Sequence, residues 1–167
     1  SEGHNLSLRH LSLSTCGLAE KVDKLGDYNL QLTLSVSLHA PDNSTRDRIM
    51  PVNKKYPVEQ VLNSCSNYFK KTGRRISYEY AMIDGVNDTP EHARLLADRL
   101  AGTGSHVNLI LLNYVDERSL RPSTPKALKE FTGILKERGV NVTVRRRLGS
   151  DIDASCGQLR RKAIDRK

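Results

Sequence analysis

The sequence lacks tryptophan, has only two phenylalanines and three cysteines, and contains no long apolar run. No hydrophobic stretch approaches the roughly 20 residues that a membrane span needs, so we expect no membrane partner. The cysteines, Cys16, Cys65 and Cys156, are odd in number and lie far apart. They form no CxxC pair and no cysteine–histidine pair at ligand spacing, which argues against a disulfide framework and against a zinc site. We therefore expect a reduced, cytoplasmic protein.

Common catalytic motifs are absent as well. The sequence contains no GxSxG, no Walker lysine loop, no GxGxxG and no HExxH, so the usual hydrolase, nucleotide-triphosphate and dinucleotide signatures are missing. With 167 residues, of which 37% are hydrophobic and 28% charged, the chain has room for one core. We therefore predict one domain over residues 1–167.

Positive charge dominates and is concentrated at the carboxyl end. The formal net charge is +8, and the 23 residues from Arg145 to Lys167 hold eight Lys or Arg against three Asp. A basic surface of this kind attracts polyanions such as nucleic acids. Charge alone fits a solvated cationic helix end equally well, so it does not decide between the two.

Short β-branched and apolar runs alternate with segments of helical period. The runs predict five strands, at residues 8–15, 30–39, 74–83, 106–114 and 140–146. Helices are predicted at residues 57–71, 90–101 and 126–138, with shorter ones at 18–25 and 44–50. The alternation indicates βαβ units and a mainly parallel α/β sheet. Because five strands cannot close an eight-stranded barrel, we expect an open sheet or further strands upstream of Ser1.

Polar or reactive groups follow every predicted strand. They are Ser14 to Gly17, Ser37 and His39, Asp84 to Asp88, Asn113, and Arg145 to Arg147. Polar residues at one strand end are usually turn chemistry, but five such ends on one rim predict a ligand site, because ligands of parallel sheets bind where strands finish. His39 itself fits a base, a ligand or a strand-end cap. The basic loop from Arg46 to Pro57 fits either phosphate contacts or an exposed connection.

One cysteine has the surroundings of a nucleophile. In "SDIDASCGQL", Ser150 or Asp151 can cap a helix, which would place Cys156 near its positive end with arginines nearby. Both features favour the thiolate. The alternative is a small buried cysteine, a description that suits Cys65, which lies midway through a predicted helix among apolar neighbours. Cys16, in a turn, stays undecided.

Five segments together resemble a known family. They are, in order, "STCG", "SLHAPDNSTRDRIMPVNKKYP", "EYAMIDGVNDTPEHA", "VNLILLNY" and "GSDIDASCGQL". The sequence is similar, from about Leu8 to Asp165, to the C-terminal half of the radical S-adenosylmethionine 23S rRNA adenine-C2 methyltransferases, the RlmN/Cfr family. "DIDASCGQL" and "NKKYP" are its most specific motifs. The resemblance implies a partial (β/α) barrel of the radical-SAM type whose strand ends hold S-adenosyl-L-methionine.

The resemblance also implies roles for particular residues. Those that look like contacts to S-adenosylmethionine are Ser14, Ser37, Leu38, His39 and Asn113, and Cys156 looks like the cysteine that becomes S-methylated. In the family, one S-adenosylmethionine methylates this cysteine. A second one is cleaved reductively by a 4Fe–4S cluster, which needs an electron donor, and the cleavage gives a deoxyadenosyl radical. This radical takes a hydrogen from the new methyl group. The resulting carbon radical adds to C2 of an adenine in rRNA. Parts of the family also act on tRNA. Since C2 is not nucleophilic, plain methyl transfer would fail there.

Some family features do not occur in the sequence. The CxxxCxxC cluster motif, the glycine–glutamate–proline loop and the resolving cysteine belong to the N-terminal half of the family, and this chain has none of them. We therefore expect a C-terminal portion of a larger enzyme, inactive alone, with no metal ligands of its own. We favour C2 over C8 because the C8 enzymes are the rarer branch. Two other classes stay open: a non-catalytic RNA-binding module derived from the family, and a hydrolase that pairs Cys156 with His39.

Overall fold

The computed structural model describes residues 7–112 and 120–145, which form one five-stranded parallel sheet with the strand order β1-β2-β3-β4-β5. The strands are β1 (Ser12–Thr15), β2 (Thr33–Ser37), β3 (Ile76–Met82), β4 (His106–Leu111) and β5 (Asn141–Val144). The α-helices are α1 (Ala19–Asp27), α2 (Asn43–Ile49), α3 (Val58–Thr72), α4 (Pro90–Leu100) and α5 (Pro125–Glu137). The predicted alternation of strands and helices is confirmed. Among the described residues, no helix has the length and apolar character that crossing a membrane requires.

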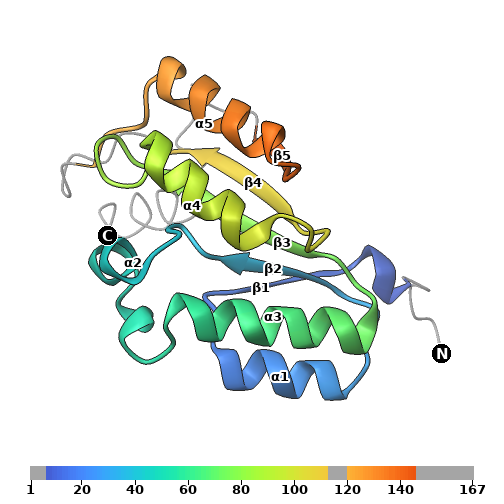
Figure 1. The fold of residues 1–167 in the computed structure, drawn as a ribbon. Coiled ribbons are helices and arrows are strands. Elements are labelled where there is room, and N and C mark those ends of the chain that lie inside the picture. Colours follow the sequence, from blue (N-terminus) through green and yellow to red (C-terminus); the bar gives the residue numbers. More distant parts are fainter. Residues whose placement is uncertain (1–6, 113–119, 146–167) are drawn as a thin grey trace, which may run out of the picture.

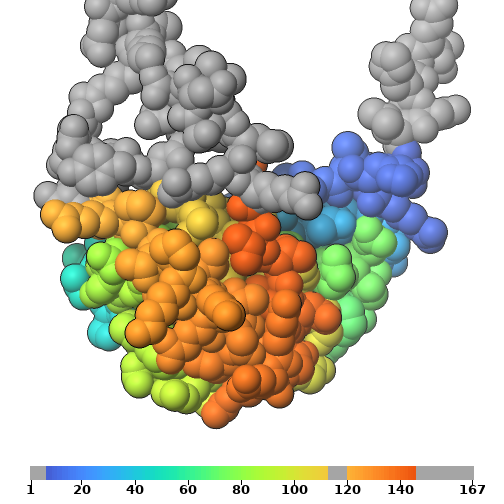
Figure 2. All heavy atoms as spheres, turned by 90° about the horizontal axis from the view of Figure 1, so that it is seen from above, coloured from blue at the N-terminus to red at the C-terminus, as the bar shows by residue number. Residues whose placement is uncertain are grey.

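Helices cover one face of this sheet. Consecutive strands are neighbours and parallel, and right-handed crossovers between such strands place every connecting helix on the same side. Figure 1 shows α3 and α4 crossing in front of the strands, with α1 beside α3. Seen from above in Figure 2, α5 (orange) lies over the middle of the view, with α4 (yellow-green) showing beside and beneath it. The ring of Phe131 on α5 lies 5.3 Å, between centroids, from that of Tyr80 on β3.

Side chains of the central strands alternate between this helical layer and the opposite face. The helix-facing positions are apolar and buried, among them Leu34, Val36, Ile76, Tyr78, Tyr80, Met82, Val107 and Leu109. The other face carries mainly polar, partly exposed positions, including Thr33, Ser35, Ser37, Ser77, Glu79, His106 and Asn108. Parallel sheets usually have both faces covered by apolar packing. The polar second face is therefore a feature that calls for a functional explanation.

Local sequence signals set the helix ends. The hydroxyl of Thr89 accepts from the amide of His92 at the start of α4, and Thr124 caps α5 in the same way through Ala127, as Ser or Thr before a proline-started helix predicts. α3 ends at Gly73, whose φ of 65° lies in the left-handed region that glycine reaches without strain.

The first predicted strand is wrong at its amino end. Residues Leu8–His10 form a 3-10 helix, in which the hydroxyl of Ser7 accepts from the amide of Arg9. The neighbouring strand begins only at Thr33, whose amide donates to the carbonyl of Leu11. Residues before Leu11 therefore have no strand to pair with, and local hydrogen bonds decide their conformation. A second 3-10 helix, Pro51–Lys54, lies in the basic loop.

Candidate functional site

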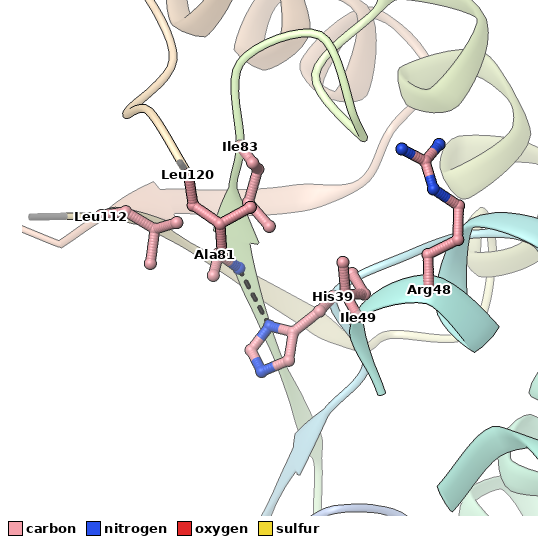
Figure 3. A pocket seen from close by; sticks show the side chains of 7 residues that line it. All are labelled: His39, Arg48, Ile49, Ala81, Ile83, Leu112 and Leu120. Atoms are coloured by element: carbon pink, nitrogen blue, oxygen red, sulfur yellow. Dashed lines mark hydrogen bonds between the residues drawn. The ribbon is translucent and has the colours of Figure 1, made fainter. Parts of the chain in front are cut away.

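A pocket opens where the strands finish. It has a volume of about 310 Å³ and is lined by His39, Arg48, Ile49, Ala81, Ile83, Leu112 and Leu120. These residues come from the ends of β2, β3 and β4, from α2 and, for Leu120, from the segment before α5. Figure 3 shows their side chains around the opening. The lining is mostly aliphatic, with one imidazole and one guanidinium. This composition suits a ligand with a flat apolar part and a few polar groups.

His39 is held in one tautomer beside this pocket. Its backbone has a φ of 58°, and its Nδ1 accepts a hydrogen bond of 3.0 Å from the amide of Ala81 (Figure 3). Nδ1 is therefore the acceptor, and in the neutral ring the proton lies on Nε2. Burial, and next the charge of Arg46, lower the pKa of His39 from 6.5 to about 4. The ring is uncharged at neutral pH and presents an Nε2–H donor. This donor makes no hydrogen bond to any described residue.

Ser37 and Leu38, which precede His39, present different groups. The Ser37 hydroxyl makes no hydrogen bond within the described part of the chain, and its side chain lies on the polar face of the sheet. Leu38 is fully buried. Its amide donates to the carbonyl of Glu79 over 3.1 Å, and its carbonyl accepts from Arg46 Nε over 3.0 Å. The backbone of Leu38 thus fixes the strand end, and Ser37 and His39 present free donors beside it.

The remaining predicted contacts lie farther along the rim or outside the described residues. Ser14 is exposed on the edge strand β1, in register with Ser35, and its hydroxyl is also free of hydrogen bonds to described residues. Ser14 and Ser37 therefore lie on the same face of adjacent strands. Asn113 and Cys156 lie outside the described residues, as does the basic tail, so their roles stay predictions.

Arg46 is a central residue of this rim that sequence reasoning missed. Its side chain is fully buried, and its guanidinium donates five hydrogen bonds. The acceptors are the carbonyls of Cys16 (2.8 Å), Ser37 (3.2 Å), Leu38 (3.0 Å) and Tyr56 (3.2 Å) and Oδ1 of Asn53 (3.0 Å). Arg46 therefore ties the end of β1 to the end of β2. The basic loop was expected to contact phosphates or to be an exposed connection, and the buried Arg46 does neither. Arg48, Lys54 and Lys55 of the same loop are exposed.

Asn87 plays a similar part at the end of β3. This buried amide donates from Nδ2 to the carbonyls of His39 and Ala81 and accepts at Oδ1 from the amide of Ile83, each over 2.7 Å. Asp88 accepts from the amide of Gly85 and from the hydroxyl of Ser123. This strand end is therefore turn chemistry, and the signal for it was the run of Asn, Asp and Gly in "DGVND".

The described cysteines have contrasting environments. Cys65 is fully buried, and burial raises the pKa of its thiol to about 12, which fits the small-hydrophobe description. Cys16 is exposed at the rim, where only its carbonyl is bound by Arg46. Among residues 7–112 and 120–145, no group of three or more His, Cys, Asp or Glu side chains could hold a metal ion. The described side chains therefore do not fit an iron–sulfur cluster.

The fold of this parallel sheet with its helices matches two solved structures. A radical SAM methyltransferase from Sphaerobacter thermophilus superposes with a TM-score of 0.89 and 41% identity, over 94% of this chain and 46% of that one. A domain of a pyruvate-formate lyase-activating enzyme from Bacteroides vulgatus has a TM-score of 0.63 at 20% identity, over 81% of this chain and 80% of that one. The partial-barrel fold of the radical-SAM type is thus confirmed.

Sequence relatives make the match more specific. A probable dual-specificity RNA methyltransferase RlmN of Desulforudis audaxviator is 52% identical over 160 residues, which are 96% of this chain and 50% of that protein. Its namesake in Caldanaerobacter subterraneus is 49% identical over 162 residues, 97% of this chain and 47% of that protein. No protein-family model matches the chain. The resemblance to the RlmN/Cfr family is confirmed, and the chain spans about half the length of the curated relatives it matches.

Proposed function

We propose that this chain is the C-terminal, cofactor-binding portion of a cytoplasmic RNA methyltransferase that uses S-adenosylmethionine to methylate C2 of an adenine. The substrate is rRNA, and tRNA as well, in line with the dual specificity in the relatives' name. The observation that carries the proposal is the rim itself. Over most of its length the chain matches RlmN proteins, and the strand ends with the "STCG" and "SLHA" segments present uncommitted donors, of which His39 lines a pocket.

The chemistry of this donor set fits S-adenosylmethionine. The cofactor offers an adenine with ring-nitrogen acceptors, a ribose, a carboxylate and a sulfonium cation. Hydroxyls of Ser14 and Ser37 and the Nε2–H of His39 can bind its acceptors, while aliphatic side chains such as Ile83 line the place for its apolar part. An uncharged His39 avoids repulsion of the sulfonium, and burial keeps the ring uncharged. When bound, the cofactor supplies the methyl group and the radical chemistry.

The iron–sulfur cluster and its electron donor belong, in this proposal, to the part of the enzyme that carries a CxxxCxxC motif. The sequence contains no such motif, so we expect the 167-residue chain alone to bind no cluster and to methylate no RNA. Iron and sulfide analysis of the complete protein and of the chain alone tests this. A complete protein without iron would favour the non-catalytic RNA-binding module, and a chain that methylates RNA by itself would refute the division of roles.

Cys156 is the residue on which the proposed chemistry depends. It is expected to carry the one-carbon unit as a methyl thioether, because a thiolate is the nucleophile that a methyl sulfonium needs. The complete protein with Cys156→Ala should therefore give no 2-methyladenine in rRNA digests analysed by mass spectrometry. Cys16→Ser is the matched control, since Cys16 lies at the rim and exposes its thiol, and this variant should keep its activity. Methylation of C2 by the Cys156→Ala enzyme would refute the assignment.

A further inference from the structure

Polar side chains form a connected row across the face of the sheet that no described helix covers. Asn108 on β4 donates from Nδ2 to Glu79 Oε2 on β3 over 2.8 Å, and Ser77 donates to Glu79 Oε1 over 3.4 Å. On the other side, Thr143 on β5 donates to Asn108 Oδ1 over 3.3 Å and lies 2.9 Å from His106 Nε2. The row thus runs from His106 through Thr143 and Asn108 to Glu79, which lies on the middle strand of the five.

The row fixes the direction of the Glu79 carboxylate. A carboxylate can only accept hydrogen bonds, so Asn108 must present its Nδ2 to Glu79, and an amide that turned over would lose this bond. A carboxylate has about four lone-pair sites, and the described donors to Glu79 use two of them. Within the described residues no Lys, Arg or His forms an ion pair with Glu79. A partly exposed carboxylate is therefore held in place with acceptor capacity left over.

Glu79 is also next to the predicted cofactor contacts. It is the register partner of Ser37, so the two side chains leave adjacent strands on the same face. Its carbonyl accepts from the amides of Leu38 and His39, over 3.1 and 3.3 Å. The backbone of Glu79 thus holds the "SLH" segment, and the side chain of Glu79 lies on the same face of the sheet as that of Ser37.

We propose that Glu79, positioned by Asn108, accepts hydrogen bonds from the ribose hydroxyls of S-adenosylmethionine, an inference that rests on the proposed function. Acidic side chains recognise ribose hydroxyls in other nucleotide sites, because a carboxylate is a strong acceptor for O–H donors. The competing role is attraction of the positively charged sulfur. The two roles differ in one respect: the ribose is present in cofactor analogues with a neutral sulfur, and the sulfonium charge is not.

Glu79→Gln in the complete protein tests the side chain, because glutamine has the same size and removes the charge and one strong acceptor. Isothermal titration calorimetry would use two probes, S-adenosylmethionine and S-adenosylhomocysteine, which share the ribose and differ in the charge on sulfur. We expect both affinities to fall about tenfold. An unchanged affinity for both, or a loss confined to S-adenosylmethionine, would overturn the proposal. Glu91→Gln is the control, since Glu91 is an exposed carboxylate on α4, and it should change neither affinity.

Asn108 is tested through its coupling to Glu79. Asn108→Ala should weaken both probes by a smaller factor, and the double variant with Glu79→Gln should bind as weakly as Glu79→Gln alone, because Asn108 acts only through the carboxylate. Additive losses would overturn the positioning role. Wild-type protein that binds neither probe would refute the proposed function together with this inference, whereas wild-type binding that is unaffected by Glu79→Gln refutes the inference alone.

Discussion

Replacing Arg46 by methionine should destabilise the fold far more than replacing an arginine two residues away. Methionine keeps much of the apolar stem and removes the guanidinium, which leaves the acceptors at Cys16, Ser37 and Leu38 and those in the basic loop without their donor. A net hydrogen bond contributes about 1 kcal/mol, and five are lost. This net value already includes the cost of taking the guanidinium out of water. Burial of the apolar methionine end offsets about 2 kcal/mol of the loss.

The balance of these effects is a loss of about 3 kcal/mol in the free energy of unfolding, as expected when buried polar groups lose their partners. Domains are stable by only about 5 to 15 kcal/mol, so the change is large. Urea unfolding followed by circular dichroism should show the midpoint lowered by about 2 M, taking a slope of about 1.5 kcal/mol per molar urea. Arg46→Lys should recover little, because one ammonium cannot reach acceptors spread around a planar fork.

Arg48→Met is the matched control. Arg48 lies on the same helix, α2, but is exposed, and it lines the pocket. Its replacement should change the free energy of unfolding by less than about 0.5 kcal/mol. If Arg46→Met and Arg48→Met unfold at the same urea concentration, the buried guanidinium does not hold the strand ends together and the reasoning is refuted.

Three further predictions concern His39, Gly17 and the two described cysteines. The pKa of His39 is about 6.5 in the unfolded chain and about 4 in the folded chain. The His39 protonation therefore costs no free energy of unfolding above pH 6.5, and this free energy should fall by about 3 kcal/mol as the pH drops from 6.5 to 4. Urea unfolding at several pH values should show this loss in wild type. His39→Asn, whose side-chain oxygen replaces the Nδ1 acceptor, should lose only the smaller stabilisation of carboxyls with lowered pKa values, such as Asp42 and Glu59. Gly17→Ala should lose about 1 to 2 kcal/mol, measured by thermal unfolding, because φ is 91° and the added Cβ would lie 3.1 Å from Val61; unchanged stability would contradict this. At neutral pH a maleimide should label Cys16 rapidly and Cys65 only after unfolding, since Cys65 is buried with a raised pKa; equal rates measured by mass spectrometry would refute that description.

Local signals in the sequence were sufficient to predict the helices and strands and their order along the chain. The alternation in "LQLTLSVSLH" marks Leu34 and Val36 as one face and Ser35 and Ser37 as the other, and the structure buries the first pair only. Thr89 is a helix cap because a hydroxyl before proline can accept from the first free amides. The strand at residues 8–15 is overextended, because a run of leucines does not reveal whether a partner strand lies beside it.

The missed residues depend on contacts between distant segments. Nothing beside Arg46 in the sequence distinguishes it from the exposed Arg48, since its acceptors come from residues up to 30 positions away. Glu79 appears in the sequence as an ordinary polar position of a strand, and only the register of β3 with β4 places it beside Asn108. The resemblance, and not a local pattern, supplied the predicted roles of Ser37 and of Cys156. Cys156 lies outside the described residues, and its role is tested by the Cys156→Ala experiment.

In the proposed site, the side chains that support the strand ends are not the ones expected to bind the cofactor. Buried side chains, Arg46 and Asn87, bind the backbone carbonyls of the strand ends, so the neighbouring side chains of Ser37 and His39 need not satisfy those carbonyls and keep their own donors free. A polar group binds a ligand well only if it is held in place and its own donor or acceptor is not already hydrogen-bonded within the protein. Arg46→Met should therefore weaken binding of S-adenosylhomocysteine to the complete protein even where the protein remains folded, at low temperature and without urea. Calorimetry that finds wild-type affinity in this variant would show that Ser37 and His39 keep their positions without the support of Arg46.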